Sequence, residues 1–153
     1  MAKPIKKSAH GGVINRRARF DYELGDSLIV GLQLTGAETK ALRMGHGQLR
    51  GAYVTDRAGE LWLINSQIMG SRGIPIGEDD QSRTRKLLAK RSEINKLVTA
   101  KQQGNTIVPL ELLTKGRYIK LKIAVGRGKK KYDKRETIKR RQQERDIARI
   151  KRM

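Results

Sequence analysis

The sequence contains no cysteine and only two histidines, and aromatic residues make up 4% of its 153 positions. The missing cysteines exclude disulfide bonds, thiolate nucleophiles and cysteine-ligated zinc. His10 and His46 lie far apart in the sequence, without the i, i+4 spacing or flanking carboxylates of a metal-binding pair. We therefore expect no metal site and no cofactor.

Acidic residues and long apolar runs are also scarce. The chain has 15 Asp and Glu against 35 Lys and Arg, which gives a formal net charge of +20. A polyanion relieves such self-repulsion, so nucleic acid is the leading expected partner and an anionic membrane surface the alternative. No stretch approaches the roughly 18 apolar residues of a spanning helix, and the N-terminus lacks the apolar core of a signal peptide. We expect a cytoplasmic protein with no membrane partner.

The apolar pattern divides the chain into an arm, one folded unit and a tail. Residues 1–13 carry charge but almost nothing to bury, which predicts a disordered basic arm. Residues 14–126 contain alternating apolar positions typical of a compact domain. Residues 127–153 hold 13 Lys and Arg against 4 Asp and Glu, so nearly half of the net charge lies in the tail.

Short strand signals dominate the middle unit. Strands are predicted from about residue 27 to the segment before Gly36, and over 49–55, 60–68, 106–113 and 117–125. Helices are predicted over 37–44, stopped by Gly45, and over 86–102, stopped by Gly104, with a surface loop over 70–84. Turn residues 56–59 and 115–116 indicate two hairpins.

The last predicted strand has one apolar and one basic face. Ile119, Leu121, Ile123 and Val125 alternate with Lys120, Lys122 and Ala124. Five short strands with two helices favour a mainly β fold with α elements, a small OB-type, partly open β-barrel with flanking helices and a basic C-terminal tail. Helices packed against a flat antiparallel sheet are the alternative.

The tail is rich in helix formers from Glu136 onward, but Ile138, Ile147 and Ile150 give it only a thin apolar line. We expect it to be disordered when free and helical when phosphates on the ribosome neutralise it. Charge alone leaves two interpretations open. One is a solvated extension that holds ribosomal RNA generically, and the other is a segment that folds in one specific RNA site.

Four separated segments carry a family resemblance. They are Asn15-Arg16-Arg17-Ala18-Arg19-Phe20-Asp21-Tyr22, Leu34-Thr35-Gly36-Ala37-Glu38-Thr39-Lys40-Ala41-Leu42-Arg43, Arg83-Thr84-Arg85-Lys86-Leu87-Leu88 and Gly128-Lys129-Lys130-Lys131-Tyr132-Asp133-Lys134-Arg135. In order and spacing they resemble small protein B, the family of transfer-messenger RNA (SsrA RNA) binding proteins. The segments together span the chain from about residue 13 to its end.

The resemblance implies a non-enzymatic bacterial RNA-binding protein that acts in trans-translation. Its OB-type barrel holds the transfer-RNA-like domain of transfer-messenger RNA. The complex enters the empty decoding site of a stalled ribosome, delivered with elongation factor Tu and GTP through the alanylated RNA. The unfinished protein is then tagged for degradation and the ribosome is rescued.

The resemblance also implies residue roles. Contacts to transfer-messenger RNA are expected from Asn15, Arg17, Arg19, Phe20, Tyr22, Glu38, Lys40, Leu88, Lys120 and Lys122. Contacts at the small-subunit decoding centre are expected from Gly128, Lys129, Lys130, Lys131, Tyr132, Asp133, Lys134 and Arg135, with the rest of the tail in the message channel.

Several of these residues also have a purely structural interpretation. Glu38 suits hydrogen bonds to RNA, fixation of nearby arginines, or the dipole at a helix N-terminus. Leu88, at the start of the second predicted helix, suits the core. Asp133 suits a base edge or the cap of a helix starting near Glu136.

The sequence departs from the family pattern at two places. Phe20 stands where the family usually has His, which keeps stacking but loses a hydrogen bond. Ile29 and Val30 stand where many members have Glu just before a glycine, here Gly31.

Two other functions fit parts of the sequence. A structural ribosomal or ribosome-assembly protein with an OB core matches the composition equally well. A nuclease holding magnesium at Glu78-Asp79-Asp80 is the enzymatic alternative, although a glycine-punctuated loop is a poor frame for a metal site.

Overall fold

A computed structural model of the chain describes residues 13–152, apart from the side chains of residues 131–133. The expected arm therefore lies outside the described residues, except for Val13, which begins a strand. The strands are β1 Val13–Ile14, β2 Tyr22–Leu32, β3 Gly47–Gln48, β4 Tyr53–Arg57, β5 Glu60–Ile64, β6 Gln67–Ile68, β7 Arg85–Leu88, β8 Thr106–Leu113 and β9 Lys120–Gly128. The helices are α1 Ala18–Asp21, α2 Gly36–Arg43, α3 Glu78–Gln81, α4 Arg91–Gln102 and α5 Lys131–Lys151.

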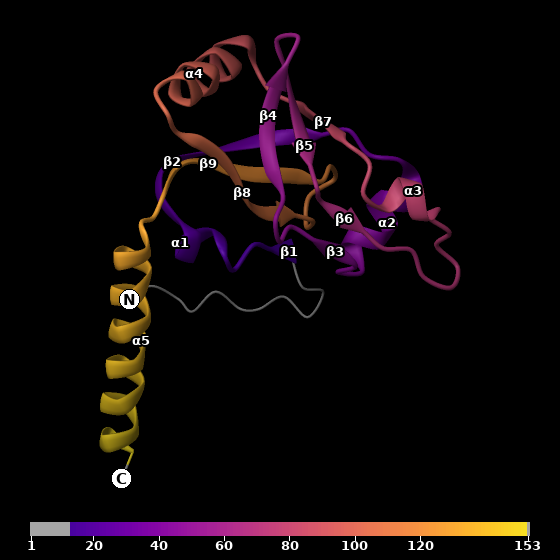
Figure 1. Cartoon of the computed structure of the whole chain (residues 1–153). Helices are drawn as coiled ribbons and strands as arrows, with labels where there is room; N and C mark the ends of the chain where they lie inside the picture. Colours follow the sequence, from indigo (N-terminus) through magenta and orange to yellow (C-terminus); the bar gives the residue numbers. More distant parts are fainter. Residues whose placement is uncertain (1–12, 153) are drawn as a thin grey trace.

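Six antiparallel strands form a ring, in the order β8-β4-β5-β7-β2-β9, and β9 returns to pair with β8. The seam between β4 and β8 has one registered pair, Val54 with Ile107, so the barrel is partly open there. β1 adds to β8, and β3 pairs with β6 outside the ring. The predicted partly open barrel is confirmed, and Figure 1 shows α4 over one end of it and α5 extending from it as a separate rod.

Apolar side chains from every strand of the ring fill its interior and form the core. Its fully buried side chains include Leu61, Leu63, Leu87, Ile107, Leu112, Leu121 and Ile123. Ala41 and Leu42 of α2 and Ile94 and Leu97 of α4 pack against this cluster. The large apolar residues of β9 therefore lie inside, as their alternation predicted.

Local signals set α2 and the first hairpin correctly. Thr35 and Glu38 form a reciprocal capping box at the start of α2, and Gly45 follows the helix with φ of 81°. The β4–β5 hairpin turns at Ala58 and Gly59, both with positive φ, so its turn is shorter than the four residues predicted. Gly104, with φ of 92°, follows α4.

The predicted helix over 86–102 is wrong at its start. Residues 85–88 form β7, which pairs with β5 and β2, and the helix begins only at Arg91. Leu87 is fully buried in this strand, whereas Leu88 points outward. The reason is long-range: β7 supplies the pairing that joins β5 to β2, and those partners outweigh local helix propensity.

The boundaries of β2 and β9 also differ from expectation. β2 begins at Tyr22 instead of about residue 27, because β9 runs to Gly128 and pairs with it there. Ala124 lies on the same side of β9 as Lys122, as its alternation predicted, and lines a hollow with Lys122 and residues near α1, although it is buried.

The tail contains one helix, α5, which begins at Lys131 instead of near Glu136. Asp133 therefore lies within the first turn of the helix, and Lys130 occupies the N-cap position. Disorder of the tail in the free protein stays a prediction. Within residues 13–152, no helix is both long and apolar enough to cross a membrane.

Candidate nucleic-acid interface

The exposed side of β2 and β9 brings several predicted RNA-binding residues together. Gly31 of β2 lies in register with Leu88 of β7 on one side and Lys120 of β9 on the other. Two residues away, Ile29 lies opposite Lys122. Leu88 is 53% exposed, so it belongs to the surface and not to the core. We call the surface formed by Ile29, Leu88, Lys120 and Lys122 the β9 face.

Gly31 allows this close arrangement. A Cβ at position 31 would lie 3.0 Å from the Cβ of Leu88. Any larger residue there would push Leu88 away from the β9 face. The glycine therefore keeps an apolar side chain next to the lysines of β9.

A hollow of about 450 Å³ continues the β9 face toward α1. Arg19, Tyr22, Lys122 and Lys129 line it, together with Glu23. Three cations beside one tyrosine ring supply the two things that RNA binding needs, phosphate partners and a stacking surface. The hollow thus joins residues from two of the separated sequence segments, and the adjoining β9 face adds Leu88 from a third.

Phe20 has a different environment from Tyr22. The side chains of Arg17 and Lys134 lie 5.5 and 5.8 Å from the centre of its ring, and Arg141 lies at 5.9 Å. Asp21 beside it pairs with Lys134 at 3.3 Å, and its carbonyl accepts the amide of Lys129 at 2.9 Å. α1 therefore docks the start of α5, and this ring already has cations over it.

Of the remaining residues predicted to bind RNA in the folded unit, one is anchored to the barrel and two are exposed. The side-chain Nδ2 of Asn15 donates to the carbonyl of Pro109 at 2.9 Å, and its backbone N–H donates to the carbonyl of Leu110. Asn15 therefore attaches the N-terminal segment to β8. Arg17 forms an exposed ion pair with Asp21 at 3.7 Å. Lys40 is exposed on α2.

Glu38 is 2% exposed and lies inside a buried ionic cluster. Its carboxylate accepts hydrogen bonds from the guanidinium groups of Arg83 and Arg85, and also from the amide of Thr35 at 3.0 Å. Burial on its own raises the pKa of Glu38, but the hydrogen bonds from Arg83, Thr35 and Arg85 outweigh it and lower the pKa below 4.5. Of the three interpretations, fixation of arginines and capping of α2 describe this residue.

Arg85 is the centre of that cluster and is fully buried. Besides Glu38, it donates to the carbonyl and hydroxyl of Ser66, and to the carbonyls of Asp80 and Gln81 at 3.0 and 3.1 Å. Burial lowers the pKa of Arg85 and Glu38 opposes this, while the guanidinium remains charged. The cluster ties together α2, β7 and α3.

The segment expected to contact the decoding centre begins at the end of strand β9 of the barrel. Gly128 ends β9 opposite Tyr22, and Lys130 precedes the first residue of α5. Lys131, Tyr132 and Asp133 form the first turn of α5. Lys134 points toward α1, where it pairs with Asp21, whereas Arg135 is exposed. The segment is therefore a strand end followed by a helix start.

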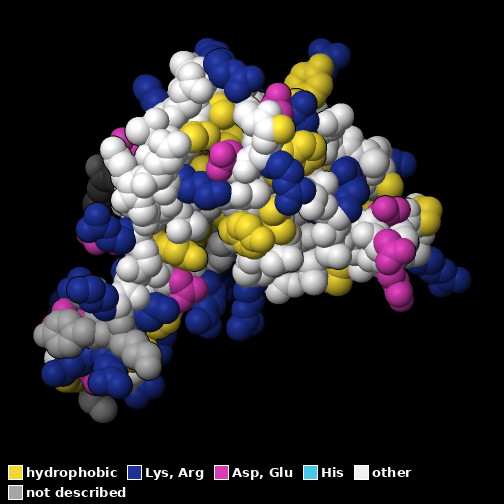
Figure 2. All heavy atoms as spheres, turned by 45° about the horizontal axis from the view of Figure 1, so that its top comes forward, with side chains coloured by type: hydrophobic (Ala, Val, Ile, Leu, Met, Phe, Trp, Pro, Cys, Tyr) yellow, Lys and Arg dark blue, Asp and Glu magenta, His cyan; other side chains and the backbone are white. Residues whose placement is uncertain are grey.

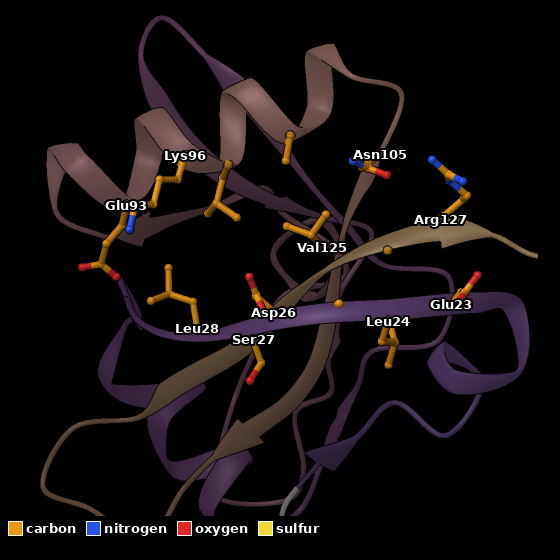
Figure 3. A pocket seen from close by; sticks show the side chains of 14 residues that line it. Glu23, Leu24, Asp26, Ser27, Leu28, Glu93, Lys96, Asn105, Val125 and Arg127 are labelled. Carbon is orange, nitrogen blue, oxygen red and sulfur yellow. The ribbon is translucent and has the colours of Figure 1, made fainter.

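Another hollow, of about 700 Å³, lies between α4 and the β2–β9 pair, and none of the predicted RNA-binding or ribosome-binding residues lines it. Figure 3 shows Glu93 and Lys96 reaching into it from α4, and Asp26 from β2. Glu23, Asp26 and Glu93 line it together with Lys96 and Arg127. Its carboxylates outnumber its cations, so it is a poor site for a phosphate backbone.

The acidic segment over 78–80 forms the exposed helix α3. In Figure 2, Asp and Glu side chains gather at the edge of the molecule where Figure 1 places α3, while Lys and Arg side chains spread over the barrel and α5. No group of three or more His, Cys, Asp or Glu in the described part of the chain could hold a metal ion.

Comparison with known proteins identifies the family. The family model described as SmpB protein matches residues 13–153. This chain belongs to the SmpB family. Its matched region begins at β1 and includes both the barrel and α5.

SmpB relatives align with nearly the whole chain. The SsrA-binding protein of Trichormus variabilis is 46% identical over 138 residues, covering 88% of each chain. The SsrA-binding protein of Gloeobacter violaceus is 44% identical over 141 residues, covering 92% of this chain and 93% of its own. A solved structure described as tmRNA-SmpB at the center of the bacterial ribosome contains a chain that matches with a TM-score of 0.66. That chain is 34% identical, and the match covers 83% of this chain and 94% of that one.

Sequence reasoning missed several residues that organise the SmpB fold here. Arg85 was missed because it falls between the predicted loop over 70–84 and the predicted helix over 86–102, where no strand was expected. As a strand, the segment places Arg85 on the same side as the buried Leu87, and that period-2 relation was the available signal. The contact of Arg43 with the loop after β8 and that of Asp21 with Lys134 had no sequence signal, because these partners lie far along the chain.

Proposed function

We propose that this protein binds transfer-messenger RNA and delivers it to stalled ribosomes for trans-translation. One observation carries the proposal: a chain of the SmpB family presents lysines and a tyrosine along the continuous exposed surface from Lys120 to Lys129. The SsrA-binding relatives and the tmRNA-SmpB structure support it. The protein acts by binding RNA in the cytoplasm and catalyses no reaction.

The β9 face and the hollow beside it hold the transfer-RNA-like domain. Lys120 and Lys122 pair with phosphates, while Tyr22 offers a ring on which a base or sugar packs. Glu38 contributes indirectly, because it fixes Arg83 and Arg85 and so holds β7, which carries Leu88.

The tail contacts the ribosome. Residues 128–135 act at the decoding centre, and the remainder of α5, whose side chains are mostly exposed and basic, lies in the message channel. Because α1 holds the start of α5, the tail leaves the barrel from a fixed point. Delivery involves elongation factor Tu and GTP through the alanylated RNA.

The proposal is tested first by sequencing the RNA that copurifies with the full-length protein from its host. We expect one small stable RNA at high enrichment and substoichiometric association with ribosomes. Equal occupancy on every small subunit would instead support a structural ribosomal protein.

A second measurement tests the surface itself. The double substitution Lys120→Glu and Lys122→Glu should weaken binding of a transfer-messenger RNA transcript and lower the salt slope of the affinity by about two, one for each phosphate contact. Lys96→Glu on α4 is the control for each single substitution, because it makes the same change of charge outside the β9 face. A loss in the control as large as that of Lys120→Glu or Lys122→Glu alone would reduce the effect to net charge.

A further inference from the structure

Tyr118 is an aromatic side chain on the surface with no assigned role. It lies in the loop between β8 and β9 and is 70% exposed, the highest fraction among the exposed large apolar residues of the described chain. An isolated exposed apolar residue is ordinary on a protein surface. The loop that carries Tyr118, however, is fastened in a way that surface loops usually are not.

The side chain of Arg43 fixes that loop through three hydrogen bonds. Arg43, the last residue of α2, donates from Nη1 to the carbonyl of Thr114 at 2.8 Å. Its Nη2 donates to the carbonyls of Gly116 and Arg117 at 3.1 and 3.0 Å. The planar guanidinium thus fixes three carbonyls within four residues, and the backbone before Tyr118 is pre-organised.

Tyr118 borders an apolar hollow of about 470 Å³. Ile29 and Leu113 form its apolar wall, and Gly116, Arg117 and Lys120 complete it. The guanidinium of Arg117 lies 5.6 Å from the centre of the Tyr118 ring, and no carboxylate lines the hollow. An aromatic face, an apolar wall and two cations on a rigid loop are the combination with which proteins hold an unpaired base and its phosphates.

We propose that Tyr118, with Ile29 and Leu113, forms a stacking site for one unpaired RNA base, whose flanking phosphates pair with Arg117 and Lys120. The proposal rests on the proposed function, because it extends the same RNA surface: Lys120 belongs both to this hollow and to the β9 face. RNA is the occupant favoured by charge, since the cations of the hollow have no carboxylate among its lining residues and the chain carries a net charge of +20.

The proposed site also assigns a role to Ile29, as an apolar contact for the base. Ile29 is 51% exposed and forms part of the wall of the hollow. A carboxylate at the wall of the hollow would repel a phosphate, whereas isoleucine offers an apolar contact to a base. An apolar side chain at this position is therefore compatible with stacking.

The test measures the affinity of full-length variants for a transfer-messenger RNA transcript at fixed salt. Tyr118→Ala should weaken binding by about 5- to 150-fold, the range for loss of one stacked base. Tyr118→Phe is the matched control and should bind within about twofold of the original protein, because stacking needs the ring and not the hydroxyl. Arg43→Lys, which keeps the charge but loses the guanidinium fork, should give an intermediate loss.

Fluorescence gives a second readout that folding alone does not change. The chain has one tryptophan, Trp62. The additional indole introduced by Tyr118→Trp should be quenched when RNA binds, beyond any change that Trp62 shows in the original protein. Thermal unfolding of each variant checks that the exposed substitution leaves the fold intact.

The outcomes separate the two proposals. If the original protein shows no preference for transfer-messenger RNA over an unrelated folded RNA, the proposed function fails. If that preference is present but folded Tyr118→Ala binds as tightly as the original, the stacking site is refuted. If Tyr118→Ala binds transfer-messenger RNA normally but no longer associates with ribosomes, the hollow contacts the ribosome instead, and the proposal is overturned as well.

Discussion

The substitution Glu38→Gln distinguishes a buried structural carboxylate from one that contacts RNA. In the native protein, Glu38 is the counter-charge of Arg85, whose side chain is fully buried. Glutamine keeps the size of the side chain but removes the charge, and its amide group presents hydrogen-bond donors to two guanidinium groups that are themselves donors. Arg85 would then carry an uncompensated buried charge.

The expected cost is about 3–5 kcal/mol, the usual loss when one partner of a buried ion pair is removed. The free energy of unfolding is measured by urea denaturation of both proteins. Asp56→Asn is the matched control, because Asp56 pairs with Lys101 at 3.0 Å in a partly exposed position. Removing a charge there should cost only about 0.2–1 kcal/mol.

The pH dependence gives an independent check. The pKa of Glu38 is lowered in the folded protein, so the carboxylate contributes stability that is fully present above its unfolded pKa of about 4.5. That contribution falls as pH drops below this value and is lost as pH passes through the lower, folded pKa. Glu38→Gln should therefore show a flatter loss of stability with acid than the original protein.

One result refutes the reasoning. If Glu38→Gln unfolds at the same urea concentration as the original protein but loses affinity for transfer-messenger RNA, the carboxylate contacts RNA directly. A large loss of stability, with RNA affinity kept under conditions where the variant remains folded, would support a role in positioning.

Two further predictions concern the tail and the packing around α2. Truncation after Lys130, which keeps Lys129 and removes α5, should leave binding of transfer-messenger RNA largely intact but abolish tagging on stalled ribosomes; loss of RNA affinity would make the tail the RNA anchor. Gly47→Ala should destabilise the fold by about 1–3 kcal/mol, because the added Cβ would lie 2.5 Å from Leu42 and 3.0 Å from Val13. Gly36→Ala is its control in the same urea assay, since a Cβ there meets nothing within 4 Å; equal losses would contradict the packing argument.

The sequence by itself determined the features that depend on near neighbours. The charge of +20 pointed to a polyanionic partner, and the alternation from Ile119 to Ile123 set the inner and outer sides of β9. Glu38 and Gly45 marked α2, because an acid at a helix N-terminus and a glycine with positive φ after the helix are local signals. The resemblance of the separated segments then identified the family that the comparison confirmed.

Tertiary structure decided everything that depends on partners distant in the chain. The segment over 85–88 forms a strand because its backbone pairs with β5 on one side and β2 on the other. Arg85 is buried as a result. Glu38 became a structural residue because Arg83 and Arg85, more than 40 positions away, reach its carboxylate. The loop that carries the exposed ring of Tyr118 is fixed because Arg43 donates hydrogen bonds to its carbonyls. Pairings of this kind follow from closure of the barrel, which no local pattern encodes.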